Sequence, residues 1–180
     1  MARAFIAVGS NINPAENVRR ALIRLAQTAV VRGVSTVYLT EPVGCQDQAS
    51  YYNCVIEVET DVGPQDFKCR VLLPIETSLG RTRTADRYAA RTIDLDLILY
   101  GDLVVNQTGL VLPDPDIVHR AFLAAPLCEL APDLVLPGSG RSVRDIAAEL
   151  SRQGMRPLDG YTRELRSVLA SARPRRQPPL

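Results

Sequence analysis

The chain alternates between short segments with the period of a β-strand and longer segments with the period of a helix. Apolar residues form a short run or occupy every second position in four segments, which predict strands at 4–8, 34–40, 53–60 and 93–100. Helical spacing of apolar residues predicts one helix from Asn13 to about Ala29 and a second from Gly63 to about Leu79. The predicted order is therefore β-α-β-β-α-β.

Local signals indicate how the two helices begin and run. Asn13 and Glu16 have the spacing of a capping box, and Pro14 suits the first helical position. In the second helix, Pro74 predicts a kink or a division because proline lacks the backbone N–H that a helix interior needs.

The predicted order is that of the ferredoxin-like fold, an α+β arrangement within the broad α/β class, in which two helices cover one face of an antiparallel sheet. Beyond Gly101 the pattern predicts an extra strand near 103–105, an apolar segment at 122–130 and a helix at 142–150, so we expect helices on both sides of the sheet. The polar members of the predicted strands alternate onto the face opposite the first two helices; these are Thr40, Asn53, Glu57, Asp94 and Asp96. Function is expected on that face.

Composition indicates one soluble globular domain. The 180 residues are 46% hydrophobic and 23% charged, and the net charge of +1 argues against a general nucleic-acid or membrane-surface binder. Four cysteines without C-x-x-C spacing and a single histidine, His119, do not supply an ordinary structural zinc site. No apolar run has the length of a membrane span or a signal sequence, so we expect a cytoplasmic protein with reduced thiols.

Charge is distributed unevenly along the chain. Residues 151–180 contain seven Arg against two acidic residues and end in a basic, Pro-rich run. Such a composition buries little apolar surface, which favours disorder. We therefore expect a domain at 1–150 and a partly disordered C-terminal extension at 151–180.

The segment from Gly80 to Asp96 carries the strongest chemical signal. Four arginines precede Asp94 and Asp96, whose i, i+2 spacing on a strand places both carboxylates on one face. Two such carboxylates suit one or two Mg²⁺ ions, and the Arg fork suits phosphate oxygens. The alternative interpretation is a solvated strand face whose acids pair with nearby arginines. The combination favours metal-assisted phosphoryl transfer, without a P-loop, because the chain lacks G-x-x-x-x-G-K-[ST].

Several separated motifs resemble the 6-hydroxymethyl-7,8-dihydropterin pyrophosphokinase family of folate biosynthesis. In chain order they are Val8-Gly9-Ser10-Asn11, Glu41-Pro42-Val43-Gly44, Tyr51-Tyr52-Asn53, Leu79-Gly80-Arg81-Thr82-Arg83, Arg91-Thr92-Ile93-Asp94-Leu95-Asp96, Arg120-Ala121-Phe122 and Pro126-Leu127-Cys128-Glu129-Leu130-Ala131-Pro132. The resemblance covers about residues 4 to 150. It implies transfer of a pyrophosphoryl group from ATP to the hydroxymethyl oxygen of the pterin, with release of AMP.

The resemblance also implies roles for individual residues. The pterin is expected between Tyr51 and Phe122, with its edge against Asn53 and the backbone around Thr40 and Val43. ATP is expected on Glu76, Arg81, Arg83, Arg91 and Arg120. The catalytic set is then Arg83, Arg91, Asp94 and Asp96, with both aspartates holding two Mg²⁺. These small molecules are the expected partners of a monomer or weak homodimer that binds neither nucleic acid nor membrane.

Two departures from the family pattern motivate an alternative. Tyr88-Ala89-Ala90 replaces a Trp-Gly-Pro sequence, and Pro113-Asp114-Pro115 replaces Pro-His-Pro, which puts a carboxylate where phosphate is expected. The alternative is therefore a catalytically impaired homologue that binds pterin or nucleotide. A remote alternative is an RNA-recognition module, which shares the strand order but exposes aromatic residues on an open sheet face.

Overall fold

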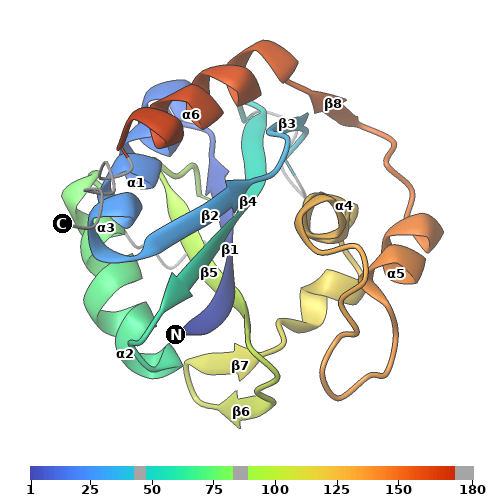
Figure 1. The fold of residues 1–180 in the computed structure, drawn as a ribbon. Helices are drawn as coiled ribbons and strands as arrows, with labels where there is room; N and C mark the ends of the chain where they lie inside the picture. The colour runs from blue at the N-terminus through green and yellow to red at the C-terminus, as the bar shows by residue number, and fades with distance from the viewer. Residues whose placement is uncertain (43–47, 83–88, 173–180) are drawn as a thin grey trace, which may run out of the picture.

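A computed structural model describes residues 1–42, 48–82 and 89–172 of the chain. Its centre is a six-stranded antiparallel sheet in the order β5-β1-β4-β3-β8, in which β2 also pairs with β4 (Figure 1). The strands of this sheet are β1 (Ala2–Ser10), β2 (Val30–Val34), β3 (Tyr38–Thr40), β4 (Tyr51–Thr60), β5 (Asp94–Tyr100) and β8 (Met155–Pro157). The ferredoxin-like α+β prediction is confirmed by this order.

Helices cover both faces of the sheet, as Figure 1 shows. The first face packs against the elements α1 (Pro14–Thr28), α2 (Pro64–Phe67), η1 (Lys68–Leu72, a π-helical turn), α3 (Leu73–Ser78) and α6 (Asp159–Ala172). The second face is covered in part by η2 (Pro115–Val118, a 3-10 turn), α4 (Ala121–Leu130) and α5 (Val143–Glu149). An RNA-recognition module leaves this second face open, so the remote alternative does not match the structure.

Strand alternation divides the buried side chains into two cores. Ile6 and Ile56 point into the first core, whereas Phe5 and Val55 point into the second. The second core fills only part of its face, and polar strand positions such as Asn53 and Asp96 occupy another part. This second face is where function was expected.

The strand predicted at 34–40 is wrong in one respect, because the structure divides it into β2 and β3. The backbone N–H groups of the three intervening residues bond to three different elements. Ser35 N donates to Val55 O at 3.0 Å, Thr36 N to Glu129 Oε2 at 2.7 Å, and Val37 N to Thr162 Oγ1 at 3.0 Å. The break is stable because every freed donor has a partner.

The predicted alternation of β5 also fails beyond Leu97. Regular alternation from 93 to 100 would put Leu99 on the same face as Leu95 and Leu97, but β1 pairs Phe5 with Leu99 and Ile6 with Leu97. The extra residue is a β-bulge, which puts Ile98 and Leu99 into the second core and Tyr100 into the first. Asp94 and Asp96 precede the bulge and keep their predicted face.

The capping box predicted at Asn13 is wrong. Asn13 has a left-handed backbone (φ 43°) and its side chain caps no helical N–H group, because capping requires an extended N-cap residue. The Asn17 amide instead donates to Ile12 O at 2.7 Å. The division expected near Pro74 is confirmed, since the π-helical turn η1 ends directly before α3, which contains this proline.

The chain after β5 forms more structure than its pattern predicted. The hairpin β6 (Val105–Gln107) and β7 (Leu110–Leu112) replaces the strand expected near 103–105, and α5 matches the helix expected at 142–150. Residues 155–172, in the predicted extension, form β8 on the edge of β3 and α6 on the first core, where Leu165 is fully buried. The last eight residues lie outside the described part of the chain.

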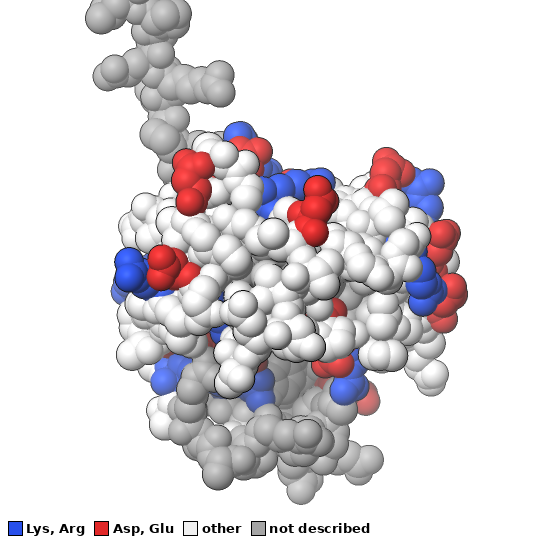
Figure 2. All heavy atoms as spheres, turned by 90° about the horizontal axis from the view of Figure 1, so that it is seen from below, with Lys and Arg blue, Asp and Glu red and all other residues white. Residues whose placement is uncertain are grey.

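The surface agrees with the balanced charge of the sequence. On the face shown in Figure 2, basic side chains lie beside acidic ones, and no broad patch of one sign is present among the described residues. None of the helices described is both long and apolar enough to cross a membrane.

Candidate active site

A pocket of about 260 Å³ opens at the polar end of the second sheet face. Its walls come from β1, β3, β4, β5 and α4, together with the turn before α4. Seven residues predicted from the sequence line it: Thr40, Tyr51, Asn53, Arg91, Asp94, Asp96 and Phe122. Residues from positions 40 to 122 thus converge on one cavity.

Gly9 forms the floor of the pocket. On the central strand β1 it pairs with Asn53 of β4 on one side and with Asp94 of β5 on the other. A Cβ atom at this position would lie 3.1 Å from Asn53 Oδ1. The missing side chain at Gly9 therefore leaves open space between the Asn53 amide and the Asp94 carboxylate. This role of Gly9 was not predicted from the sequence.

The pocket has one uncharged, partly aromatic end. Tyr51 begins β4 and Phe122 lies in the first turn of α4, and both line the cavity. Between these elements, Asn53 Nδ2 donates a 2.7 Å hydrogen bond to Thr40 Oγ1, which fixes the direction of the amide. The Asn53 Oδ1 atom consequently faces the floor at Gly9.

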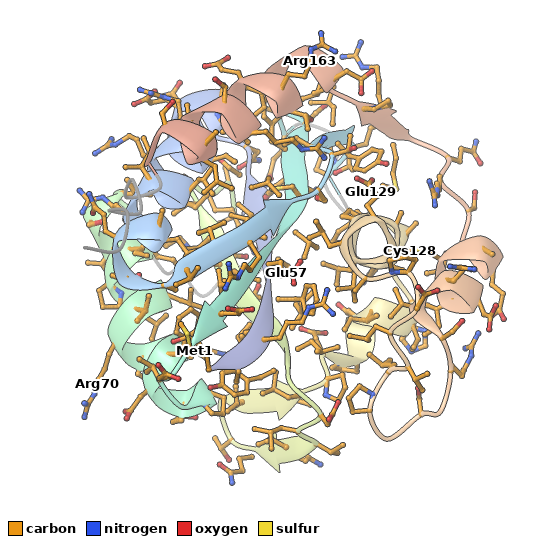
Figure 3. All side chains as sticks on the ribbon, viewed as in Figure 1. Met1, Glu57, Arg70, Cys128, Glu129 and Arg163 are labelled. Atoms are coloured by element: carbon orange, nitrogen blue, oxygen red, sulfur yellow. The ribbon has the colours of Figure 1, made fainter. Side chains whose placement is uncertain are left out.

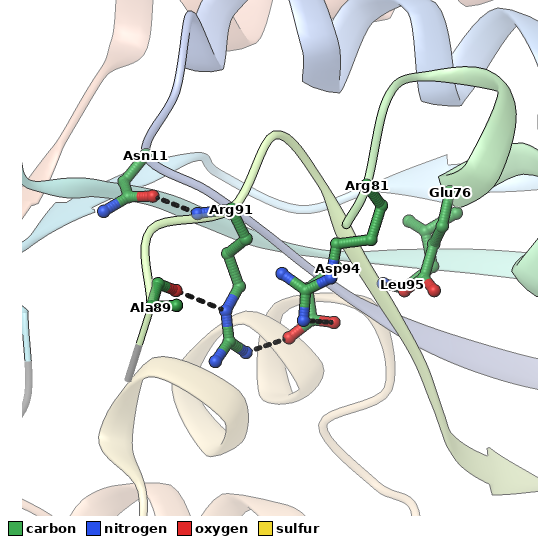
Figure 4. Close-up of polar contacts among 7 residues, drawn as sticks. All are labelled: Asn11, Glu76, Arg81, Ala89, Arg91, Asp94 and Leu95. Atoms are coloured by element: carbon green, nitrogen blue, oxygen red, sulfur yellow. Dashed lines mark hydrogen bonds and ion pairs between the residues drawn. The ribbon is translucent and has the colours of Figure 1, made fainter. Parts of the chain in front are cut away.

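The other end of the pocket is charged. Arg91 and Arg81 both form ion pairs with Asp94, Arg81 at 3.2 Å (Figure 4). Burial opposes the charge on Arg91, but the neighbouring Asp94 carboxylate raises the pKa of this guanidinium. Asn11 holds the same segment in place, because its Oδ1 accepts a 2.7 Å hydrogen bond from Arg91 N.

Asp96 lies beside this ion-paired group, and its side chain opens to the pocket. The surrounding protein desolvates the carboxylate and the charges of Asp94 and Glu76 repel it, which together raise the pKa of Asp96 to about 7. A divalent cation relieves such repulsion. The donor set therefore fits a metal ion.

Asp94 and Asp96 are the two carboxylates of β5 that line the pocket and could hold such an ion. No cluster of three or more His, Cys, Asp or Glu side chains suited to a metal occurs in the described ranges. Mg²⁺ commonly uses one or two carboxylates and completes its shell with water and substrate phosphates.

Glu76 lies behind the strand and does not line the pocket. Its side chain is buried, and Oε1 accepts a 2.8 Å hydrogen bond from Leu95 N, between the two aspartates (Figure 4). The sequence analysis expected Glu76 near the nucleoside of ATP. Its observed contact is with the strand that carries the carboxylates.

The turn before α4 adds two carboxylates to the pocket wall. Asp114 Oδ1 accepts a 2.8 Å hydrogen bond from Asp116 N, and burial raises the pKa of Asp114. Arg120 does not line the pocket; its Nε lies 3.7 Å from Asp116 Oδ2. Val43 and Arg83, the remaining predicted site residues, lie outside the described part of the chain.

An aromatic pocket beside converging carboxylates and arginines, on a ferredoxin-like sheet, defines the class of phosphoryl-transfer enzymes. Residues 5–132 match the sequence profile of 7,8-dihydro-6-hydroxymethylpterin-pyrophosphokinase. The chain is 39% identical over 156 residues to the 2-amino-4-hydroxy-6-hydroxymethyldihydropteridine pyrophosphokinase of Haemophilus influenzae, covering 85% of this chain and 93% of that protein. The enzyme of the same name from Pseudomonas aeruginosa is 36% identical, with 88% and 98% covered.

The fold has a counterpart among solved structures. The wild-type HPPK-DHPS protein of Plasmodium falciparum matches with a TM-score of 0.67 at 12% identity, over 87% of this chain. The present chain spans 47% of that longer protein. The chain belongs to the 7,8-dihydro-6-hydroxymethylpterin-pyrophosphokinase family and is an ATP-dependent pyrophosphokinase of folate biosynthesis.

Proposed function

We propose that the pocket binds 6-hydroxymethyl-7,8-dihydropterin at its aromatic end and the triphosphate of ATP at its charged end. The observation that carries this proposal is the convergence of Tyr51, Asn53 and Phe122 with Asp94 and Asp96 on one cavity. A flat heterocycle stacks favourably on aromatic rings, and its polar edge needs fixed donors and acceptors. The Asn53 amide, oriented by Thr40, meets that need.

Asp94 and Asp96 would hold Mg²⁺, in keeping with the fit described above. When bound, the metal neutralises negative charge on the transferred phosphoryl group. Glu76 would support this site indirectly, because its bond to Leu95 N fixes the backbone between the two ligands.

The arginines supply the phosphate contacts. Arg81 and Arg91 are both paired with Asp94 in this structure. Once Asp94 ligates a cation, that cation neutralises part of its negative charge, so Asp94 depends less on the two arginines. Their forks then become available to the triphosphate, where planar bidentate pairing is strong. Arg83 and Arg120 are proposed to add to the same phosphate contacts, and the sequence resemblance supports both.

The reaction needs mainly positioning and charge stabilisation. The hydroxymethyl oxygen bonds to the β-phosphorus, the bond from this phosphorus to the α-phosphate oxygen breaks, and AMP leaves. The hydroxyl proton passes to water. Tyr51, Asn53 and Phe122 orient the hydroxymethyl group, while Arg91 stabilises the charge that develops during transfer.

The test is AMP formation from ATP and Mg²⁺, with and without the pterin. We expect AMP that depends on the pterin and is lost in Asp96→Ala. Phe122→Ala should raise the KM for the pterin at least about tenfold, because the stacking contact is lost, and leave the KM for ATP within about twofold. A folded wild-type protein that binds pterin without forming AMP would support the impaired homologue instead.

A further inference from the structure

Helix α4 connects the pocket to the break between β2 and β3. Phe122 and Leu123 line the pocket from its first turn, and Glu129 lies near its other end. Glu129 follows Phe122 by seven positions, which is about 10 Å along a helix at a rise of about 1.5 Å per residue. Both residues therefore belong to one short helix, in which Pro126 lies between them.

The Glu129 carboxylate accepts one hydrogen bond from the break between β2 and β3 and one from β3, although the side chain is solvent-exposed. Oε2 accepts a hydrogen bond from Thr36 N at 2.7 Å, and Oε1 accepts one from the Tyr38 hydroxyl, also at 2.7 Å. Figure 3 shows Glu129 between α4 and β3. Tyr38 itself is buried, and burial together with the bond to Glu129 raises the pKa of its hydroxyl to about 12. This donor consequently keeps its proton at neutral pH.

Strand β3 leads directly from this contact to the opposite wall of the pocket. Tyr38 pairs with Asn53 of β4, and Thr40 pairs with Tyr51. Thr40 also accepts the hydrogen bond from the Asn53 amide. Glu129 thus connects the helix that carries Phe122 to the strands that carry the other substrate-facing residues.

Two further contacts hold the same end of α4 close to the sheet. Arg3 Nη2 donates to Leu130 O at 3.3 Å. A Cβ atom at Gly33 would lie 3.1 Å from Leu130 Cδ2, so glycine permits the close approach of helix and strand. With this end fixed, the two bonds of Glu129 set how α4 meets β3.

We propose that Glu129, with Tyr38, is a positioning residue that sets the separation between the Phe122 wall and the Thr40–Asn53 wall of the pocket. Glu129 affects recognition of the flat heterocycle and not of the triphosphate, because Asp94 and its paired arginines take no part in the hydrogen bonds of Glu129. The proposal rests on the pterin site proposed above.

The experiment compares Glu129→Ala, Tyr38→Phe and the double variant in the full chain. For Glu129→Ala we expect the KM for the pterin to rise about three- to tenfold, because small misplacements of binding groups are costly, with the KM for ATP within about twofold. Tyr38→Phe should give a smaller rise. The double variant should be no worse than Glu129→Ala, because Tyr38 acts through Glu129. The matched control is Glu149→Ala, which removes a carboxylate from α5 that pairs with Arg141.

The outcomes separate this proposal from the assignment of the pocket. An unchanged pterin KM in Glu129→Ala, or additive effects in the double variant, would overturn the positioning role. Equal rises in the KM for the pterin and the KM for ATP, together with a lowered Tm, would also overturn the positioning role, because they indicate general destabilisation. A pterin KM that is insensitive to Phe122→Ala would instead overturn the pterin site, and this proposal with it.

Discussion

The carboxylate of Glu76 accepts a 2.8 Å hydrogen bond from the backbone N–H of Leu95, the residue between Asp94 and Asp96. The helix segment on the first face of the sheet is thereby bonded to the strand whose carboxylates line the second face. The contact is buried, and Glu76 is only 2% exposed. The orientation of the two aspartates consequently depends on a residue outside the pocket.

Replacing Glu76 should therefore affect stability as well as activity. Glu76→Ala leaves the buried Leu95 N–H without its acceptor, which we expect to lower the free energy of unfolding by about 2 kcal/mol. Glu76→Gln retains an acceptor oxygen and should cost about half as much. Urea unfolding measures both, with the exposed Glu16→Ala as control. Equal stability of all three variants would contradict the structural role of this bond.

The two aspartates should have opposite effects on the stability of the metal-free protein. Asp94→Asn removes the partner of Arg81 and Arg91, and we expect a loss of about 1–2 kcal/mol for this partly buried group. Asp96→Asn removes a repelled carboxylate and should raise stability by up to about 1 kcal/mol, since solvent in the pocket screens the repulsion.

Both aspartate variants should nevertheless lose pterin-dependent AMP formation by at least about a hundredfold, since each removes a proposed metal ligand and its charge. Thermal unfolding in the presence of a chelator measures the stabilities, and an AMP assay measures the activity. The interpretation fails if the two substitutions shift the Tm in the same direction.

The pH dependence of stability should report Asp96. Desolvation by the surrounding protein and repulsion from the neighbouring carboxylates raise its pKa from 3.8 to about 7 in the folded protein. The folded state therefore holds a proton that the unfolded chain releases, so this contribution to stability is fully present below pH 3.8 and is lost as the pH rises through about 7. Mg²⁺ competes with the same proton, so its affinity should rise over the upper part of this range.

Chelated and Mg²⁺-loaded protein can be compared in unfolding experiments from pH 5 to pH 8, roughly the window that brackets the raised pKa. Asp96→Asn is the control and should flatten the pH dependence of the chelated form. A Mg²⁺ affinity that does not change with pH in the wild-type protein would contradict the assignment.

The C-terminal helix should contribute substantially to stability. Leu165 of α6 is fully buried in the first core, and Leu165→Ala should cost about 3 kcal/mol through lost burial and the cavity that remains. Arg163→Ala, on the exposed side of the same helix, should change stability by less than about 0.5 kcal/mol. If both variants unfold like the wild-type protein, α6 is not part of the cooperative domain.

Strand alternation and residue chemistry were sufficient to predict the sheet and much of the pocket. The period of two placed Asn53, Asp94 and Asp96 on one face, and the structure confirms that all three line one cavity. Such predictions succeed because they depend only on local geometry. The β-bulge at Ile98 shows their limit, since an extra residue against β1 reverses every later position.

The strand β8 and the helix α6 in the C-terminal segment were not predicted, for a different reason. Tyr161, Leu165 and Leu169 have helical spacing, but the charged residues between them dominate the composition. The Tyr161 ring meets Tyr52 edge-on at 5.3 Å, and Thr162 bonds to Val37 N. These partners are more than a hundred residues away along the chain, so no local pattern indicates that α6 packs against the sheet.

By itself, the sequence determined the strand order, the two carboxylates beside a group of arginines, and the family to which the chain belongs. Only the tertiary structure decided that Glu76 supports Leu95 from behind the sheet, that Gly9 is the floor of the pocket, and that Glu129 joins α4 to β3. The physical reason is that spacing along one element follows from backbone geometry, whereas these contacts join elements whose relative placement is fixed by packing of the two cores.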